Sequence, residues 1–294
     1  MKVINGKNIK NRLPRVAAIH DLSCFGRCAL TVVIPTLSAM GVQVVPIPTA
    51  LLSTHTGGFT NMYFEDLTDR MEEISRHLDS LNVKFDAIYT GFLASERQIS
   101  VVSEFIDRFA DEDCLVFVDP VMGDDGELYS TYTRELAEGM KRLCERADII
   151  TPNLTEACIL ADVVYDTDKS RSFDGACSFA ESLCARIGRF TSAKIVITGL
   201  HYGGGFVGSY VCDGDKKALF GGAHIDANYP GTGDLFASVL LGRILQGEPL
   251  SMAAKEASGF TRDTVDYSLQ FPTPIREGVA LEGMLQNLIK KQEK

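Results

Sequence analysis

The sequence predicts an α/β protein, a three-layer α/β/α sandwich around a mostly parallel central sheet. Short apolar runs alternate with amphipathic stretches along nearly the whole chain, a pattern typical of strands joined by covering helices. Most of the runs are apolar without interruption, as expected of strands that are covered on both faces. Hydrophobic residues make up 45% of the 294 residues, which is enough for a large core. Because we find no linker, repeat or low-complexity segment, we expect a single domain spanning 1–294, with 1–14 as a flexible N-terminal extension.

The predicted elements follow this alternation in order along the chain. A helix at 27–40 contains Pro35, which normally kinks or breaks a helix. The segment 203–226 alternates with period two around a Gly-Asp turn and is predicted to be an antiparallel hairpin. Three helices are predicted after it, at 232–246, 249–267 and roughly 276–292. The six predicted strands before it are 15–20, 42–48, 86–91, 114–120, 147–152 and 193–199.

Charge and composition exclude several classes of function. The net charge of −10, without a lysine- or arginine-rich block, argues against nucleic acid as a partner, because phosphate backbones require clustered cations. No run of 18 apolar residues occurs, so we expect no membrane span. The polar, basic N-terminus lacks the apolar core of a signal peptide. We therefore expect a cytoplasmic protein with reduced cysteines, and Cys24 and Cys28 are too far apart in sequence for a CxxC pair.

Several familiar motifs fail when their context is considered. "GGGFVG" at 203–208 fits GxGxxG, but a strand-like sequence follows it where a dinucleotide site needs a helix. No GxxxxGK[ST] phosphate loop is present, and the five histidines lack metal-ligand spacing.

The predicted strands end in polar, glycine-rich loops, and the carboxyl ends of parallel strands are where such sheets bind ligands. "PGTGDLF" at 230–236 adds glycines at the start of a helix. The free N–H groups and dipole of that helix end would form a cradle for a phosphoryl group. Asp234 in this turn could take a proton from a hydroxyl lying against the cradle. It could equally cap the helix, and the motif alone leaves both interpretations open.

Two further loops carry carboxylates at adjacent strand ends. "VDPVMGDDG" contains Asp119 and Asp124, and "TPNLTE" contains Thr151, Asn153 and Glu156. Magnesium prefers a few oxygen ligands together with substrate phosphates, so this pattern suits a Mg–ATP site. Taken singly, Asp119 reads as a turn residue and Glu156 as a charge at a helix N-terminus. We expect both to be surface carboxylates whose removal leaves folding intact.

Four motifs in this order, "LSTHTGGF", "DPVMGD", "TPNLTEA" and "PGTGDLFAS", resemble the ribokinase-like superfamily. Within it the chain is most similar to the pyridoxal/pyridoxamine kinases, over about residues 15–270. The resemblance implies ATP-dependent phosphorylation of the 5′-hydroxymethyl group of a B6 vitamer, with ATP and Mg²⁺ required. It also implies a homodimer.

The resemblance assigns a role to each matching position. Asp234 would be the base, and the amides of Gly231, Thr232 and Gly233 would hold the transferring phosphoryl group. Asp119 and Glu156 would bind the Mg²⁺ of Mg–ATP, directly or through water. The nucleotide would be contacted by Asp124, Thr151, Asn153 and Thr198. The vitamin ring would be contacted by Asp21, Thr49, His55 and Phe92.

Asp21 departs from the pattern, since many pyridoxal kinases carry serine there. An ionised aspartate only accepts hydrogen bonds, which favours an amine or a ring N–H and so pyridoxamine or a hydroxymethyl-aminopyrimidine. Hydroxymethylpyrimidine kinase of thiamine synthesis is therefore the main alternative, beside a sugar kinase of the same superfamily. A catalytically dead binding regulator is disfavoured by the intact Asp234 motif.

Overall fold

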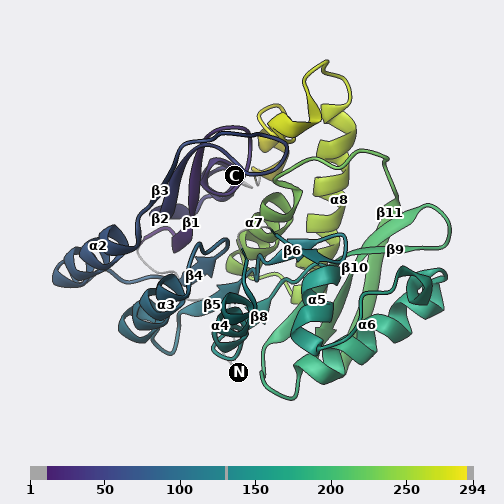
Figure 1. Cartoon of the computed structure of the whole chain (residues 1–294), viewed down its shortest axis with the longest axis horizontal. Helices are drawn as coiled ribbons and strands as arrows, with labels where there is room; N and C mark the ends of the chain where they lie inside the picture. Colours follow the sequence, from purple (N-terminus) through teal and green to yellow (C-terminus); the bar gives the residue numbers. More distant parts are fainter. Residues whose placement is uncertain (1–11, 130–131, 290–294) are drawn as a thin grey trace, which may run out of the picture.

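The computed structural model describes residues 12–129 and 132–289, so most of the predicted N-terminal extension lies outside the described residues. The central sheet has nine strands, in chain order β1 (Arg15–Phe25), β2 (Gln43–Thr54), β3 (Phe64–Asp66), β4 (Ala87–Thr90), β5 (Leu115–Val118), β8 (Ile149–Ile150), β9 (Lys194–Tyr202), β10 (Phe206–Asp213) and β11 (Lys216–Ala223). In space they are ordered β11-β10-β9-β8-β5-β4-β1-β2-β3. Figure 1 shows β1–β3 and β9–β11 at opposite sides of the molecule.

The six predicted strands form the parallel part of this sheet. β1 pairs in parallel with both β2 and β4, and the series continues through β5, β8 and β9. β10 and β11 add to β9 as an antiparallel meander, which confirms the predicted hairpin. The sequence after "GGGFVG" is β10 and not a helix, so the rejection of a dinucleotide motif is also confirmed.

Alternate residues of the strands enter two separate cores, which makes the structure three layers. Ala17 and Ile19 of β1 face one core, whereas Val16 and Ala18 face the other. Such runs must be apolar at every position because both faces are covered. One face is covered by α2 (Thr68–Ser80), α3 (Glu96–Phe109), α4 (Arg134–Cys144), α5 (Leu154–Ala161) and α6 (Phe173–Ile187), and the other by α1 (Leu30–Ala39), α7 (Thr232–Leu245) and α8 (Leu250–Ser268).

The first two strands run further than the sequence predicts. β1 and β2 continue to Phe25 and Thr54, and the short edge strand β3, which was not predicted, pairs antiparallel with β2. A small separate hairpin, β6 (Gly123–Asp124) with β7 (Glu127–Leu128), follows β5. These extensions bring the polar loop sequences of 20–25 and 49–54 into regular strands that project past the sheet edge.

The prediction of a helix at 276–292 is wrong for the part of this range that the structure describes. The chain there forms two short 3₁₀ helices, η2 (Ile275–Glu277) and η3 (Leu285–Leu288). Gly278 separates them with φ +81°, and a Cβ at this position would lie 2.5 Å from the carbonyl oxygen of Arg27. A helix cannot pass through such a residue, and this conformation is one that glycine adopts readily. α1, by contrast, continues through Pro35.

None of the described helices is long and apolar enough to cross a membrane. All eight cysteines lie in the described part of the chain and are free thiols, as the sequence predicts.

Candidate active site

The predicted site residues gather at the carboxyl edge of the parallel strands. Asp21 lies in the second half of β1 and Thr49 lies within β2. Phe92 comes two residues after β4, and Asp119 directly follows β5. β2 and β4 lie on opposite sides of β1 in the sheet, and such a switch in strand order opens a crevice for ligands. The loop that opens α7 approaches the same edge, since Asp234 exerts an electrostatic effect on both Asp21 and Asp119.

The N-terminus of α7 has no side-chain cap among the described residues. Its N-cap is Gly231, with φ +81°, and a Cβ there would lie 2.2 Å from the Arg27 carbonyl oxygen. Only glycine permits this approach of the loop to the segment before α1. The Thr232 hydroxyl turns away and donates to the carbonyl of Tyr229 at 3.1 Å. The first-turn N–H groups and the helix dipole are therefore available to an anion.

The Asp234 carboxylate does not cap its own helix. Its Oδ2 accepts a hydrogen bond from the N–H of Ala29 at 2.8 Å and one from the thiol of Cys28 at 3.5 Å. Both donors lie just before α1. Gly231 holds the N-cap position, so the capping interpretation of Asp234 is not what the structure shows. Burial raises the pKa of Asp234 above its ordinary value, and these two hydrogen bonds oppose the rise.

Two further carboxylates lie near Asp234, and no ion pair in the described part of the chain balances their charge. Burial and the charge of Asp234 raise the pKa of Asp21 to about 7, against a hydrogen bond from Ser23. The same two causes raise the pKa of Asp119 to about 8, and the nearby Thr151 side chain opposes the rise. Among the described residues no ion pair involves these groups. A cationic ligand would relieve this repulsion.

The N-terminus of α5 is closed, in contrast to that of α7. The Asn153 side chain accepts from the Glu156 N–H at 2.9 Å, and Glu156 Oε2 accepts from the Asn153 N–H at 2.8 Å, which completes a capping box. The other oxygen of Glu156 accepts from the Met122 N–H at 3.1 Å. The expectation of surface carboxylates is wrong, because Asp119 is 7% exposed and Glu156 is 3% exposed. Burial and the nearby Asp119 raise the pKa of Glu156.

The small hairpin β6–β7 lies against this closed helix end. The Asn153 amide donates to the carbonyl of Gly123 at 2.8 Å, and the Gly126 N–H donates to the Thr155 hydroxyl at 2.9 Å. Asp124, in the same hairpin, is exposed. Thr198, within β9, forms a parallel bridge with Asn153 just beyond the end of β8. Asn153, Thr198 and Asp124 thus share one corner of the site.

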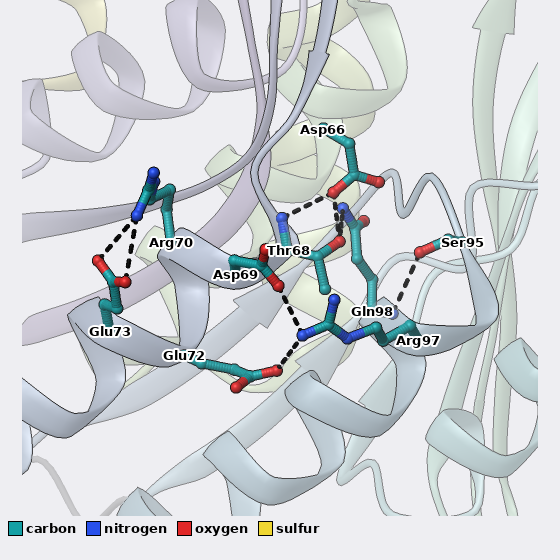
Figure 2. Close-up of polar contacts among 9 residues, drawn as sticks. All are labelled: Asp66, Thr68, Asp69, Arg70, Glu72, Glu73, Ser95, Arg97 and Gln98. Carbon is teal, nitrogen blue, oxygen red and sulfur yellow. Dashed lines mark hydrogen bonds and ion pairs between the residues drawn. The ribbon is translucent and has the colours of Figure 1, made fainter.

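A second group of predicted residues lies at the opposite corner, where Thr49 and Phe92 meet. The Thr49 hydroxyl donates to the carbonyl of Phe92 at 3.2 Å. Gln98, buried at the start of α3, donates to the Thr49 carbonyl at 2.9 Å and to the Thr68 hydroxyl at 3.1 Å. Figure 2 shows Gln98 beside Thr68 and Ser95 where α2 and α3 meet. Phe92 adds a ring contact to Tyr132 at 6.2 Å between centroids.

His55 is tied into the protein through both ring nitrogens. Nδ1 accepts from the Gly57 N–H at 3.1 Å, so Nε2 carries the proton and donates to the Arg276 carbonyl at 2.7 Å. Burial lowers the pKa of His55, which keeps the ring neutral. The residue is buried, and its hydrogen-bonding capacity is used to hold the segment around Arg276.

A cavity of about 460 Å³ lies beside the β9–β10 turn. Its lining includes Arg171, His201, Phe206, His224 and the glycines 203–205. The rings of His201 and His224 meet edge to face at 4.7 Å between centroids. Burial and the neighbouring His224 lower the pKa of His201, and the charges of Asp125 and Asp124 oppose this shift. Asp124 therefore lies near this cavity as well as near the corner of Asn153 and Thr198.

No group of three or more His, Cys, Asp or Glu residues is arranged to hold a metal ion by itself within 12–129 and 132–289. Magnesium bound to a nucleotide needs only one or two protein carboxylates, because phosphates and water complete its shell. Asp119 is the carboxylate that fits this requirement best. Both oxygens of Glu156 already accept backbone hydrogen bonds.

The fold and this edge define a phosphotransferase of the ribokinase-like class. The phosphomethylpyrimidine kinase family matches residues 18–276, and the chain belongs to this family. Among curated proteins, it is 26% identical to pyridoxal kinase of Dictyostelium discoideum, over 83% of each chain. It is 29% identical to pyridoxine/pyridoxal/pyridoxamine kinase of Bordetella avium, over 83% of this chain and 82% of that one.

Solved structures of similar proteins support the same family and fold. A Bacteroides thetaiotaomicron protein provisionally assigned as a phosphomethylpyrimidine kinase superposes with a TM-score of 0.90 at 39% identity, covering 98% of both chains. A second crystal form of that protein contains pyridoxal, with a TM-score of 0.87 over 96% of this chain and 98% of that one. Pyridoxal kinase of Lactobacillus plantarum gives a TM-score of 0.86 at 28% identity, over 94% and 97% of the chains.

Sequence reasoning missed the residues that hold the site together from a distance. Cys28 and Ala29 contact Asp234 from a segment about 200 positions earlier, and Arg276 holds His55 from near the C-terminus. Gly26, two residues before Cys28, was the available signal, because a glycine before a helix marks a turn with a special backbone. Nothing in the sequence pattern points to the partner of that turn.

Proposed function

We propose that this chain transfers the γ-phosphoryl group of ATP to the 5′-hydroxymethyl group of a B6 vitamer. The observation that carries the proposal is the uncapped N-terminus of α7 with Asp234 in its first turn, beside Asp21 and Asp119. An anion cradle and a proton acceptor at one point are what phosphoryl transfer to an alcohol requires. The family match and the pyridoxal kinase relatives support the same activity.

Asp234 would act as the general base. Its Oδ2 is occupied by donors from the start of α1, and Oδ1 would accept the proton of the substrate hydroxyl. The hydroxyl oxygen then bonds to the γ-phosphorus as the bond to the bridging oxygen of ADP breaks. The N–H groups of Gly231, Thr232 and Gly233 would stabilise the phosphoryl oxygens during this step.

The nucleotide would extend from this cradle past Thr151, Asn153 and Thr198. Its base and ribose would enter the cavity beside His201 and the glycines 203–205, whose volume of about 460 Å³ falls within the range of small-molecule sites. Asp124 lies between cradle and cavity. This path would place the nucleotide beside the 203–226 hairpin.

Magnesium would bind at Asp119 together with the nucleotide phosphates, with Glu156 behind it. The ion would neutralise phosphate charge during transfer. The fit rests on a buried carboxylate that has a raised pKa and no cationic partner among the described ion pairs. Asp119→Asn should raise the Mg²⁺ concentration for half-maximal turnover several-fold, measured by titrating Mg²⁺ at fixed ATP. An unchanged midpoint would remove Asp119 from the metal site.

The vitamin ring would lie between Asp21, Thr49, His55 and Phe92. Asp21 is buried with a pKa of about 7, so a substrate amine or ring N–H would form a charge-assisted hydrogen bond with it. Phe92 would pack against the ring, and His55 would contribute its ring surface. Because pyridoxamine carries an amine, its interaction with Asp21 would favour it over pyridoxal.

Hydroxymethylpyrimidine is the second candidate substrate, favoured by the description of the matching family and by Asp21. An ADP-release screen of pyridoxal, pyridoxamine, pyridoxine, hydroxymethylpyrimidine and ribose tests both candidates. We expect the highest kcat/KM for a B6 vitamer. A higher kcat/KM for hydroxymethylpyrimidine would reverse the assignment. Turnover of ribose and of none of the other compounds would exclude both candidate substrates.

A homodimer and a cytoplasmic location stay predictions. Light scattering on the purified chain tests the first, and fractionation of the source cells tests the second.

A further inference from the structure

Cys28 is the one thiol of the chain that contacts the proposed base. Its Sγ lies 3.5 Å from Oδ2 of Asp234, and the next residue, Ala29, donates its N–H to the same oxygen at 2.8 Å. Six of the other cysteines lie in or pack against one hydrophobic core, at positions 114, 144, 158, 177, 184 and 212. Cys28 instead is partly exposed at the edge that carries the site.

We propose that Cys28 is a positioning residue for phosphoryl transfer, which with the Ala29 N–H holds Oδ2 of Asp234 and leaves Oδ1 for the substrate hydroxyl. The inference rests on the proposed role of Asp234 as the base. Two donors on one oxygen fix the rotation of a carboxylate about its side-chain bond. General-base catalysis depends on such placement, because the acceptor must lie within hydrogen-bond reach of the proton it removes.

The thiol is in the state that this role needs. Burial and the charges of Asp234 and Asp21 raise the pKa of Cys28 well above its ordinary value. The group therefore stays protonated and can donate, whereas a thiolate would repel the carboxylate. The hydrogen bond in turn favours the ionised form of Asp234, which is the form that accepts a proton.

The backbone around Cys28 is held from several directions. The Cys28 N–H donates to the Thr31 hydroxyl at 3.1 Å, and that hydroxyl lies 2.7 Å from the Cys28 carbonyl oxygen. The Arg27 N–H donates to the Glu277 carbonyl at 2.9 Å. Gly231 packs against this segment so closely that its Cβ would lie 3.4 Å from the Cys28 Cα. The thiol is thus presented to Asp234 by a fixed turn.

The test compares kinetic constants for ADP release, with pyridoxal as acceptor and saturating Mg²⁺. Cys28→Ala removes the donor and should lower kcat about five-fold, with the KM for ATP within two-fold of the parent, since the weak hydrogen bond of a thiol is lost while the phosphate cradle remains. Cys28→Ser keeps a donor and should recover much of the loss. Cys177→Ala, which removes a partly buried thiol from α6, is the matched control and should match the parent.

Coupling to the base separates positioning from a general structural effect. In the Asp234→Asn background, Cys28→Ala should cause no further loss of kcat, because the thiol acts only through the carboxylate. A five-fold loss in both backgrounds would overturn the proposal, as would equal loss for Ala and Ser or no loss for Ala. Should Cys28→Ala fail to fold, Cys28→Val, which also lacks a donor, takes its place with the same expectation.

The outcomes also separate this inference from the proposed function. If Asp234→Asn retains kcat, the base is elsewhere and the role of Cys28 falls with it. If Asp234→Asn is inactive while the Cys28 variants equal the parent, the base assignment stands and only the inference about Cys28 is overturned.

Discussion

Two helices begin at the same edge of the sheet, and their first turns differ. α5 starts with a capping box in which Asn153 and Glu156 satisfy each other's backbone N–H groups. α7 starts with Gly231 and has no side-chain cap among the described residues, and its acidic residue Asp234 points to the start of α1 instead. A capped helix end uses its donors for its own stability, whereas an uncapped one leaves them for a ligand.

This difference separates two carboxylates that look alike in the sequence. Glu156 and Asp234 both occupy the third position of a helix after a polar or glycine-rich turn. Glu156 is buried, and both of its carboxylate oxygens accept backbone hydrogen bonds, one from the N–H of Asn153 and one from the N–H of Met122. Asp234 accepts hydrogen bonds from described residues through Oδ2 only. We therefore expect chemistry at α7 and mainly support at α5.

The largest expected effect comes from removing the proton acceptor. Asp234→Asn keeps the size of the side chain, so kcat should fall by about 10²–10⁴-fold while the affinity for ATP barely changes. Glu156→Gln keeps a side chain that can close a capping box, so at saturating Mg²⁺ its loss should stay below about ten-fold. Steady-state ADP release with both variants gives the comparison. Similar losses at the two positions would erase the distinction between the helices.

A smaller effect is expected at Asp21, the carboxylate that lies with Asp234 on the substrate side. Asp21→Ser should shift preference from pyridoxamine toward pyridoxal, because a charge-assisted hydrogen bond worth about 1.5–3 kcal/mol is lost. The ratio of kcat/KM values for the two vitamers should move by about ten-fold or more. A ratio that stays constant would mean that Asp21 does not contact the substrate amine.

Two glycines in the α7 turn provide a matched test of its geometry. Gly231→Ala forces a Cβ to 2.2 Å from the Arg27 carbonyl at φ +81°, whereas a Cβ at Gly233 meets nothing within 4 Å. Gly231→Ala should therefore lower the melting temperature by on the order of 5 °C, and Gly233→Ala should leave it near that of the parent. Equal melting temperatures for the two variants would contradict the close approach of the loop to the segment before α1.

The smallest expected effect is a dependence of stability on pH in the ligand-free protein. The folded-state pKa of Asp21 is about 7, against an ordinary value of 3.8. The folded state therefore holds the proton more tightly, so stability is full below about pH 4 and falls as the pH rises through about 7. Thermal unfolding at pH 5.5 and pH 8 should show a drop on the order of a few degrees. The drop should shrink in Asp21→Asn, and an unchanged drop would show that Asp21 is not its source.

Much of the fold could be predicted because both faces of the parallel strands are buried. Alternate residues such as Ala17 and Ala18 enter different cores, and only an apolar run satisfies both. The hairpin and the helices α7 and α8 also followed from local patterns. The break of the segment after α8 into two short 3₁₀ helices could not be predicted, because Gly278 is fixed by a contact with Arg27, which is distant in sequence.

The candidate site could be predicted only where a motif is local. Asp234 with its glycines and the pair Asn153 and Glu156 are each contained in a few consecutive residues. The sequence did not reveal which carboxylates are buried, because Asp119 and Glu156 are covered by segments that meet them only in the folded chain. For the same reason the partners of Asp234 and His55 were missed.

A crystal structure with Mg²⁺, ADP, aluminium fluoride and pyridoxal tests the contrast between the two helices most directly. Aluminium fluoride takes the place of the transferring phosphoryl group. We predict that it lies within hydrogen-bond distance of the N–H groups at the start of α7, with a carboxylate oxygen of Asp234 facing the pyridoxal hydroxymethyl group. Aluminium fluoride bound at the start of α5, or an Asp234 that faces away from the hydroxymethyl group, would contradict the account.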